Sequence, residues 1–269
     1  MSNPKVEPDA VLEPHIQQSR KRSQSDEVTL VLHDSSRMSF GSEGYREGLS
    51  ESTGGHQHFV AHVSLAVSGD GTVRPHGVLA VSRHVVNQGS KRQTSTGEAT
   101  AKGELQKRWS ANIEQVHALG MDGRRIVHVM DREADDYEVF CCIEGLGSGF
   151  VIRMQHNRRL VEGDKIRDRL GSVTFRARRT VVLGYRSGQA GAKQKQIHPP
   201  RKARQATLDI GSTTVVLKRP GSASKTTASS QQINVVYVRE VEPPDDKTAV
   251  EWVLLTSEPV DEVEQLLET

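Results

Sequence analysis

Two aspartates stand directly after short apolar runs of the sequence. Asp34 follows the run at 27–33, and Asp131 follows the β-branched run at 126–130. Such runs are typical of buried strands, so each carboxylate is predicted at the carboxyl end of a strand, where ligands and catalytic groups gather in open α/β sheets. If the two strands lie side by side, both carboxylates can bind one divalent cation. Carboxylate, water and phosphate oxygens suit Mg2+ or Mn2+.

This pair of acids suits phosphoryl transfer. Two cations a few Å apart stabilise the attacking and leaving oxygens of an in-line displacement, and a third acid normally completes such a site. The acids after Asp131 have a simpler explanation. Glu133, Asp135 and Asp136 stand where a helical pattern opens, and acidic side chains cap helix starts and complement the helix dipole. We therefore keep Asp131 as a candidate ligand and assign the other three acids to the helix start.

The elements predicted around the two acids follow a recognisable order. Three strands, a helix, a strand and a second helix are predicted at residues 27–34, 58–67, 72–82, 104–119, 126–130 and from 132 onward. The second and third strands are joined by a Gly-containing turn and are expected to pair antiparallel beside the first. Acids at the ends of the first and fourth strands, in this order of elements, match an RNase H-like α/β core with a mixed sheet.

Three histidines share one face of the predicted second strand by a period of two, namely His56, His58 and His62. A metal triad is conceivable at this face. No cysteine or acid joins the histidines at ligand spacing, so a solvated or partly packed face is the better interpretation.

The pattern changes beyond Gly149. Four β-branched runs, punctuated by Gly, Pro and Ser, follow at 150–154, 172–183, 206–217 and 233–241. They predict an inserted antiparallel β subdomain over 150–248, between a first core part at 27–149 and a return strand with the start of a final helix at 249–269. Residues 1–26 show no sustained period and predict a flexible lead-in.

Basic side chains concentrate in this predicted insertion. Residues 150–204 contain fifteen Lys or Arg and only three acidic residues, although the whole chain has a net charge of +2. Such a block is a candidate surface for a polyanion. The candidate contacts for such a polyanion are Arg153, Arg158, Arg159, Arg178, Arg179, Arg201 and Lys202. No apolar run reaches the length of a membrane span and the polar N-terminus lacks a signal-peptide core, so we expect a cytoplasmic protein without a membrane partner.

Two pieces of the sequence resemble the DDE transposases of the bacterial insertion-sequence-four group, which cut and paste DNA through hairpin ends. The first is D-R-E-A-D at 131–135, and the second is E-W-V-L-L-T-S-E-P-V at 251–260. The segment at 34–36 looks like that family's first-acid motif, an Asp followed by two small hydroxyl residues. The segments at 150–153 and 201–203 look like parts of its insertion domain. The resemblance runs from about residue 27 to the C-terminus.

The resemblance implies that Asp34 and Asp131 are catalytic metal ligands for Mg2+ or Mn2+. It implies double-stranded DNA of transposon ends as the partner, a nucleoid location, and a synaptic complex that could contain two copies of the chain. Arg153 would contact the DNA backbone; the alternative is a solvated strand arginine. Trp252 would stack on a base flipped out of the transposon end, or it is an ordinary core tryptophan, and both interpretations stay open.

The sequence also departs from the family. The family's third acid lies in a Tyr-Arg-Glu-Lys signature on a helix downstream of the 251–260 piece, and the chain contains no such signature. The nearby acids Glu258, Glu262, Glu264 and Glu268 stand too early and lack the accompanying Tyr and Arg. The family's N-terminal DNA-end-binding region is mostly absent before Glu27. We therefore expect a truncated or split transposase that keeps the fold and two metal ligands but not strand cleavage.

Three functions remain open at this point. The first is a transposase core that becomes active when another chain supplies the missing glutamate. The second is a non-catalytic DNA-binding remnant that acts through its basic insertion. The third is an unrelated RNase H-like nuclease whose third acid lies elsewhere, for instance at Glu133.

Overall fold

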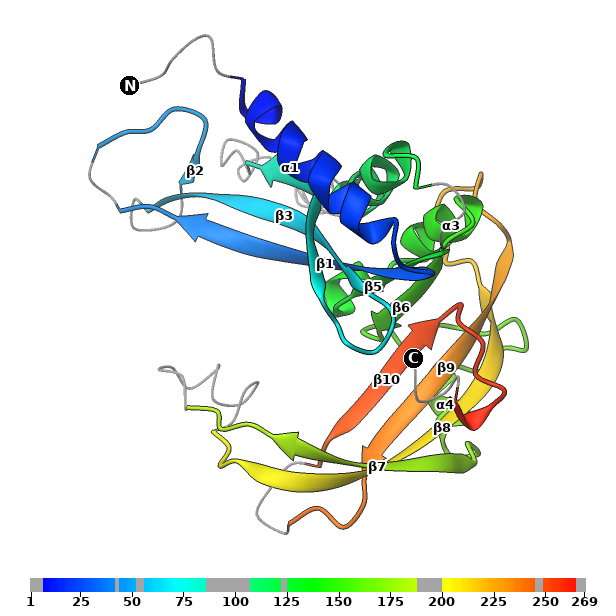
Figure 1. The fold of residues 1–269 in the computed structure, drawn as a ribbon. Coiled ribbons are helices and arrows are strands. Elements are labelled where there is room, and N and C mark those ends of the chain that lie inside the picture. The colour runs from blue at the N-terminus through cyan, green and yellow to red at the C-terminus, as the bar shows by residue number, and fades with distance from the viewer. Residues whose placement is uncertain are drawn as a thin grey trace. The chain divides into compact units, whose positions relative to one another are not determined.

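The structure is a computed structural model that describes residues 7–41, 44–51, 56–85, 107–121, 125–187, 200–244 and 249–264. The protein is of the α/β class, with parallel and antiparallel strands in a mixed sheet. The chain forms two compact units (Figure 1). The first comprises Met1–Gln155 with Arg219–Ser229, and the second comprises His156–Lys218 with Ser230–Thr269.

The first unit is built on a mixed sheet. Its strands are β1 (Val28–Ser39), β2 (Ser50–Glu51), β3 (Gln57–Ser68), β4 (Pro75–His84), β5 (Arg125–Met130) and β6 (Gly149–Arg153). They lie in the order β4–β3–β1–β5–β6, and β2 also pairs with β3. β3 is antiparallel to β1 and β4, whereas β1, β5 and β6 are mutually parallel. The predicted antiparallel pairing of the second and third strands beside the first is confirmed.

The described part of the first unit also contains four helical segments. They are α1 (Pro8–Ser23), a helix over residues 107–118, the short 3-10 helix η2 (Arg132–Ala134) and α3 (Tyr137–Gly145). In the 107–118 helix, Trp109, Ile113 and Val116 recur at steps of three or four and are fully buried. This periodicity explains why a helix was predictable here. Its predicted first residues, 104–106, lie outside the described residues.

Helix α1 differs from the predicted flexible lead-in. It begins with Pro8 in its first turn and packs on β4, and polar side chains make several of its contacts with the rest of the unit. Arg22 donates to the His76 carbonyl at 2.7 Å, Arg20 donates to the Gly120 carbonyl at 2.8 Å, and His15 Nε2 accepts from the Val78 amide at 3.1 Å. The helix therefore carries no strong apolar stripe, which is the feature that periodicity detects.

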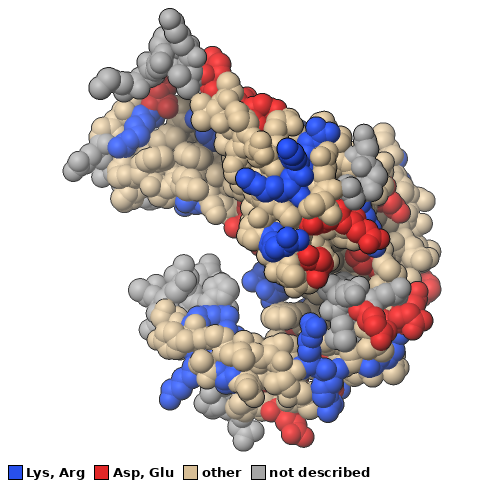
Figure 2. All heavy atoms as spheres, in the orientation of Figure 1, with Lys and Arg blue, Asp and Glu red and all other residues tan. Residues whose placement is uncertain are grey.

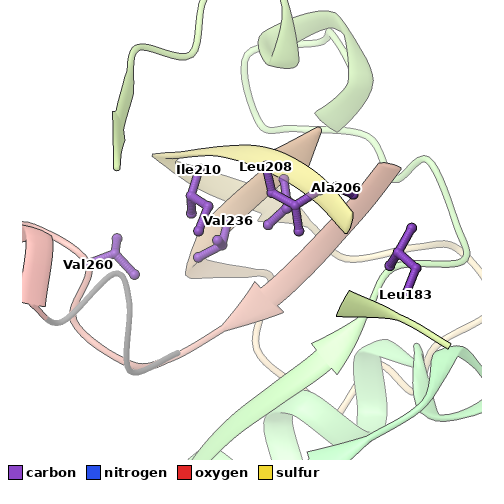
Figure 3. Packing of buried hydrophobic residues seen from close by; sticks show 7 residues of the cluster. Leu183, Ala206, Leu208, Ile210, Val236 and Val260 are labelled. Atoms are coloured by element: carbon purple, nitrogen blue, oxygen red, sulfur yellow. The ribbon is translucent and has the colours of Figure 1, made fainter. Parts of the chain in front are cut away.

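The second unit is an antiparallel sheet in the order β10–β9–β8–β7. Its elements are α4 (Ile166–Leu170), β7 (Phe175–Leu183), β8 (Arg204–Lys218), β9 (Ser230–Glu240) and β10 (Glu251–Thr256). Leu208 and Ile210 of β8 pack with Val236 of β9 and with Val260, which follows β10 (Figure 3). All four runs predicted beyond Gly149 are strands, but the first of them, β6, belongs to the first unit. Residues 263–264 begin the predicted final helix, and its remainder lies outside the described residues.

Gly77 lets α1 approach β4 closely, which gives a stability prediction. Its φ is +126°, and a Cβ at this position would overlap Ser19 Oγ. Gly77→Ala should therefore lower the free energy of unfolding by about 3 kcal/mol, through backbone strain and overpacking. Urea denaturation measures this loss. The matched control is Gly171→Ala, because Gly171 has a φ of −64° and a Cβ there would meet no atom within 4 Å. Equal stabilities of the two variants would contradict this account.

Candidate active site at the strand ends

The register of β1 and β5 brings the two predicted aspartates side by side. His33 pairs with Met130 in this parallel ladder, so the next residues, Asp34 and Asp131, take corresponding positions on adjacent strands. Adjacent strands lie about 4.8 Å apart. Both aspartates are exposed. One detail differs from the prediction: β1 does not end at Asp34 but continues to Ser39, paired with β3 alone among the described strands.

Asp131 is held in a defined turn. Its Oδ1 accepts a hydrogen bond from the Glu133 amide at 2.8 Å, which caps η2. Asp136 caps α3 in the same way by accepting from the Glu138 amide at 2.8 Å, as its helix-start role predicted. Asp135 has another role: it is buried, and its Oδ2 accepts from the Gln155 amide at 2.6 Å. The assignment of Asp135 to the helix start is therefore corrected; it ties the turn to the segment after β6.

Arg153 completes a row of charged residues along the strand ends. Met130 pairs with Ile152 in the parallel ladder of β5 and β6, so Arg153 follows next to Asp131. Partial burial and the nearby Arg132 lower the pKa of Arg153, and Asp131 opposes that shift. The row thus runs Asp34, Asp131, Arg153 across three parallel strands. Arg153 belongs to the first unit, although the sequence pattern grouped it with the insertion.

Arg108, in the first turn of the 107–118 helix, contacts residues that follow Asp34 and Asp131 in the chain. The sequence pattern did not identify Arg108 as a candidate. Its Nε donates to Ser35 Oγ at 3.0 Å, and its Nη2 donates to Glu133 Oε2 at 2.7 Å. Burial lowers the pKa of Arg108, whereas Glu133 and Asp131 oppose that shift. The only sequence signal was an arginine at the start of an amphipathic helix, and such residues are usually solvent-exposed.

A buried chain of hydrogen bonds runs beneath the row. Asn112 Nδ2 donates to Ser64 Oγ at 3.1 Å, Ser64 Oγ contacts His33 Nδ1 at 3.0 Å, and His33 Nε2 contacts His128 Nδ1 at 2.8 Å. Asn112 is the donor to Ser64 Oγ, and the direction of the two bonds to the histidine rings follows from the tautomer of each ring. The chain links β3, β1 and β5 through buried side chains.

His62 lies beside this chain, and the face that it shares with His56 and His58 is partly packed, as predicted. His62 is fully buried, its Nδ1 contacts Ser35 Oγ at 2.8 Å, and its ring meets Trp109 edge-on at 4.4 Å. His58 is half-buried and His56 is exposed. Burial, with smaller effects from Arg108 and His84, lowers the pKa of His62 to about 4. Burial and His117 lower the pKa of His128 to about 3.

The strand-end acids fit a hard divalent cation only in part. Asp34 and Asp131 are exposed carboxylates on adjacent strands, a donor set that suits Mg2+ or Mn2+ when water and phosphate oxygens complete the sphere. Glu133 stands two residues from Asp131, but Arg108 binds its carboxylate. Within the part of the chain that the structure describes, no group of three or more His, Cys, Asp and Glu side chains could hold a metal ion. The residues thus provide two ligands.

The basic candidates of the second unit divide into paired and exposed side chains. Figure 2 shows Lys and Arg side chains over β7 and β8. Arg178 donates to Asp209 at 2.7 Å, and Arg201 donates to the Gly184 carbonyl at 3.1 Å. Arg158 is half-buried, whereas Arg159, Arg179 and Lys202 are exposed. The exposed Arg159, Arg179 and Lys202 are better placed to bind phosphates. An arginine in an ion pair must first separate from its carboxylate partner.

Trp252 lies on β10, opposite Val238 of β9, and is 39 % exposed. It is therefore not enclosed as an ordinary core tryptophan would be. The structure does not place a base against it, so stacking on DNA stays a prediction.

No protein-family model matches the chain. Among the described residues, the structure contains no helix with the length and apolar character needed to cross a membrane.

The buried histidines predict a pH-dependent stability. Their folded-state pKa values lie below the ordinary value of about 6.5, so the unfolded chain binds more protons as the pH falls below 6.5. Stability should therefore fall between pH 6.5 and 4, by about 1 kcal/mol per pH unit for each of His62 and His128. Chemical denaturation at several pH values measures this slope. His128→Leu should reduce the slope relative to the wild type; equal slopes in the two proteins would contradict the assignment.

Proposed function

We propose that this chain forms the catalytic core region of a DDE-type DNA transposase, which binds transposon-end DNA and takes part in Mg2+-dependent strand cleavage and transfer. The observation that carries the proposal is the adjacency of Asp34 and Asp131 at corresponding positions of two parallel strands. The D-R-E-A-D and L-L-T-S-E-P-V pieces of the sequence support the same family.

The strand order supports an RNase H-like core. The order β4–β3–β1–β5–β6, with β3 antiparallel to its neighbours and β1, β5 and β6 parallel, is the arrangement expected of that core. The antiparallel second unit fits the proposed insertion, since it follows β6 in the chain and carries the exposed basic side chains. Such a protein would work on DNA in the cytoplasm, at the nucleoid.

Each residue of the row has a role in this proposal. Asp34 and Asp131 would hold the cation, which when bound would polarise the phosphodiester and activate a water molecule. The turn that fixes Asp131 Oδ1 on the Glu133 amide orients this carboxylate in advance. Arg153 would bind a phosphate oxygen next to the acids, since a guanidinium donates in a geometry that matches phosphate.

The two-acid site also limits the proposed activity. A third acid would be needed to complete the site, and Glu133 is held by Arg108. We therefore propose that cleavage requires a third carboxylate beyond the described residues or from another chain. The bound state of Glu133 weighs against an unrelated nuclease that uses Glu133 as its third ligand.

A second candidate function is DNA binding without cleavage. The exposed side chains of Arg159, Arg179 and Lys202 favour it, because phosphate contacts alone supply sequence-independent affinity. This function needs neither aspartate.

Metal binding separates the two candidate functions. Asp34→Asn and Asp131→Asn should each weaken Mn2+ binding by at least about tenfold, measured by calorimetry, because each removes one of two charged ligands. The matched control is Asp136→Asn, which removes the same charge from a nearby residue that caps α3. Unchanged binding in all three variants would remove the basis of the catalytic proposal. A second assay measures nicking of supercoiled plasmid. If the wild type nicks the plasmid and Asp131→Asn does not, two acids are sufficient for strand cleavage and no third carboxylate is required.

DNA affinity should depend on the exposed basic side chains. The triple variant Arg159→Ala, Arg179→Ala and Lys202→Ala should flatten the slope of log K against log salt concentration by about 3, because three phosphate contacts are lost. Fluorescence anisotropy with a DNA duplex at several salt concentrations measures this slope. Arg169→Ala is the control, because Arg169 is paired with both Glu162 and Asp164. An equal change in the control and the triple variant would contradict the assigned surface.

A further inference from the structure

The strands β7 and β8 continue as a two-stranded ribbon beyond the end of β9 (Figure 1). Among the described strands, β9 pairs with β8 only from Leu208 onward, whereas β7 pairs with β8 from Arg204 onward. Past these strand ends, Arg186 and Arg201 exchange two backbone hydrogen bonds of 2.8 and 3.0 Å. The ribbon therefore keeps one register as far as this pair of arginines.

Tyr185 lies where the apolar core on one face of the ribbon ends. Side chains alternate between the two faces of a strand, so Tyr185 follows Val181 and Leu183 on the same face. Leu183 belongs to the apolar cluster of the second unit, and Val181 packs against that cluster. Tyr185, in contrast, is 74 % exposed. The backbone of the ribbon thus fixes the position of this ring, while the ring itself is open to solvent.

Positive charge surrounds Tyr185 on the ribbon. Residues 179–187 and 200–207 contain five Lys or Arg and no acidic residue. The exposed Lys202 stands directly opposite Tyr185, because the next pair along is Arg186 with Arg201. Since those arginines exchange both backbone bonds, the pair before them is of the closely spaced kind, with Cβ atoms about 5 Å apart. A cation therefore adjoins the exposed ring.

Arg179 adds a second exposed cation to the same face. It pairs with Leu208, a member of the apolar cluster, and it stands six residues before Tyr185, so both side chains belong to one face of the strand. Six residues of a strand span about 20 Å. This face thus offers a cation, and farther along it an aromatic ring with a second cation beside it.

An aromatic ring flanked by cations matches an unpaired base between phosphates. In a duplex the flat faces of the bases are stacked on one another, whereas a single strand leaves them open to an aromatic side chain. Phosphate contacts alone do not require an exposed ring, because cations supply them. The combination of Tyr185 with Lys202 therefore favours a single strand over a duplex.

We propose that the β7–β8 ribbon binds single-stranded DNA, with Tyr185 stacked on an unpaired base and with Lys202 and Arg179 bound to phosphates of the same strand. The inference rests on the DNA binding proposed above, and it names the form of DNA that this part of the second unit binds. It requires neither a metal ion nor the two aspartates.

Fluorescence anisotropy with a labelled oligothymidine and with a duplex of the same length tests this inference. Tyr185→Ala should weaken binding of the single strand by about tenfold, because one stacked base is lost, and should leave the duplex affinity within about twofold of the wild type. Tyr185→Phe should keep the affinity for the single strand, since the ring and not the hydroxyl makes the stack. Both variants should unfold at the urea concentration of the wild type, because this side chain is exposed.

Salt dependence separates the ring from the charges. Tyr185→Ala removes no cation, so the slope of log K against log salt concentration for the single strand should equal that of the wild type. Lys202→Ala should flatten this slope by about 0.7, because one phosphate contact is lost. The matched control is Tyr45→Ala, which removes an 86 % exposed tyrosine from the first unit and should leave the affinity for the single strand unchanged.

Three outcomes would overturn the inference while leaving the proposed DNA binding intact. The first is an affinity for the single strand that is unchanged in Tyr185→Ala, and the second is an equal loss for the single strand and the duplex. The third is a loss in Tyr45→Ala as large as that in Tyr185→Ala. Absence of wild-type binding to both forms of DNA would refute the proposed DNA binding, and the inference with it.

Discussion

The parallel register between β1 and β5 is the constraint on which the candidate site depends. A slip by one residue would turn every side chain of a strand to the opposite face and separate Asp34 from Asp131. Two kinds of contact oppose this slip. Val31 and Ile126 pack in one apolar cluster, and His33 meets His128 across the two strands at 2.8 Å. The imidazole contact is directional, so it requires this register, whereas the apolar contact alone would tolerate small shifts.

The interior beneath the site is unusually polar for a strand core. Asparagine, serine and histidine side chains there are linked in sequence, from Asn112 to His128. Among the described residues, Asn112 Oδ1, His62 Nε2 and His128 Nε2 are buried without a hydrogen-bond partner. Breaking the linked chain would add to these unpaired buried groups, so the chain favours one arrangement of the side chains. The cost is sensitivity to acid, since protonation of a buried imidazole would reverse the direction of at least one hydrogen bond.

Much of the scaffold could be predicted from the sequence, and the reasons are physical. The runs that became β1, β5 and β6 are β-branched and apolar because both faces of a central parallel strand are covered, and the 107–118 helix shows its apolar spacing directly. The positions of Asp34 and Asp131 follow from those runs. Helix α1 could not be predicted, because it carries no strong apolar stripe and its arginines bind backbone carbonyls far away in the sequence. The parts of the site that sequence reasoning missed are set by long-range contacts: Arg108 and Glu133 are 25 residues apart in the chain, and nothing local distinguishes a buried arginine from an exposed one. Arg178 shows the reverse case, since its charge made it a candidate for DNA, yet Asp209 on the neighbouring strand binds it.

The extension of β1 beyond Asp34 has a consequence for assembly. From Ser35 to Ser39 the strand pairs with β3 on one side, while its pairing with β5 ends at His33. Among the described strands, none pairs with this stretch on the side that faces β5 earlier in β1, and such an edge is a template for adding a strand from another molecule. Arg37 and exposed serines on this stretch raise the energy of such stacking. The charged and hydroxyl side chains of this extension therefore oppose the pairing of one copy of the chain with another.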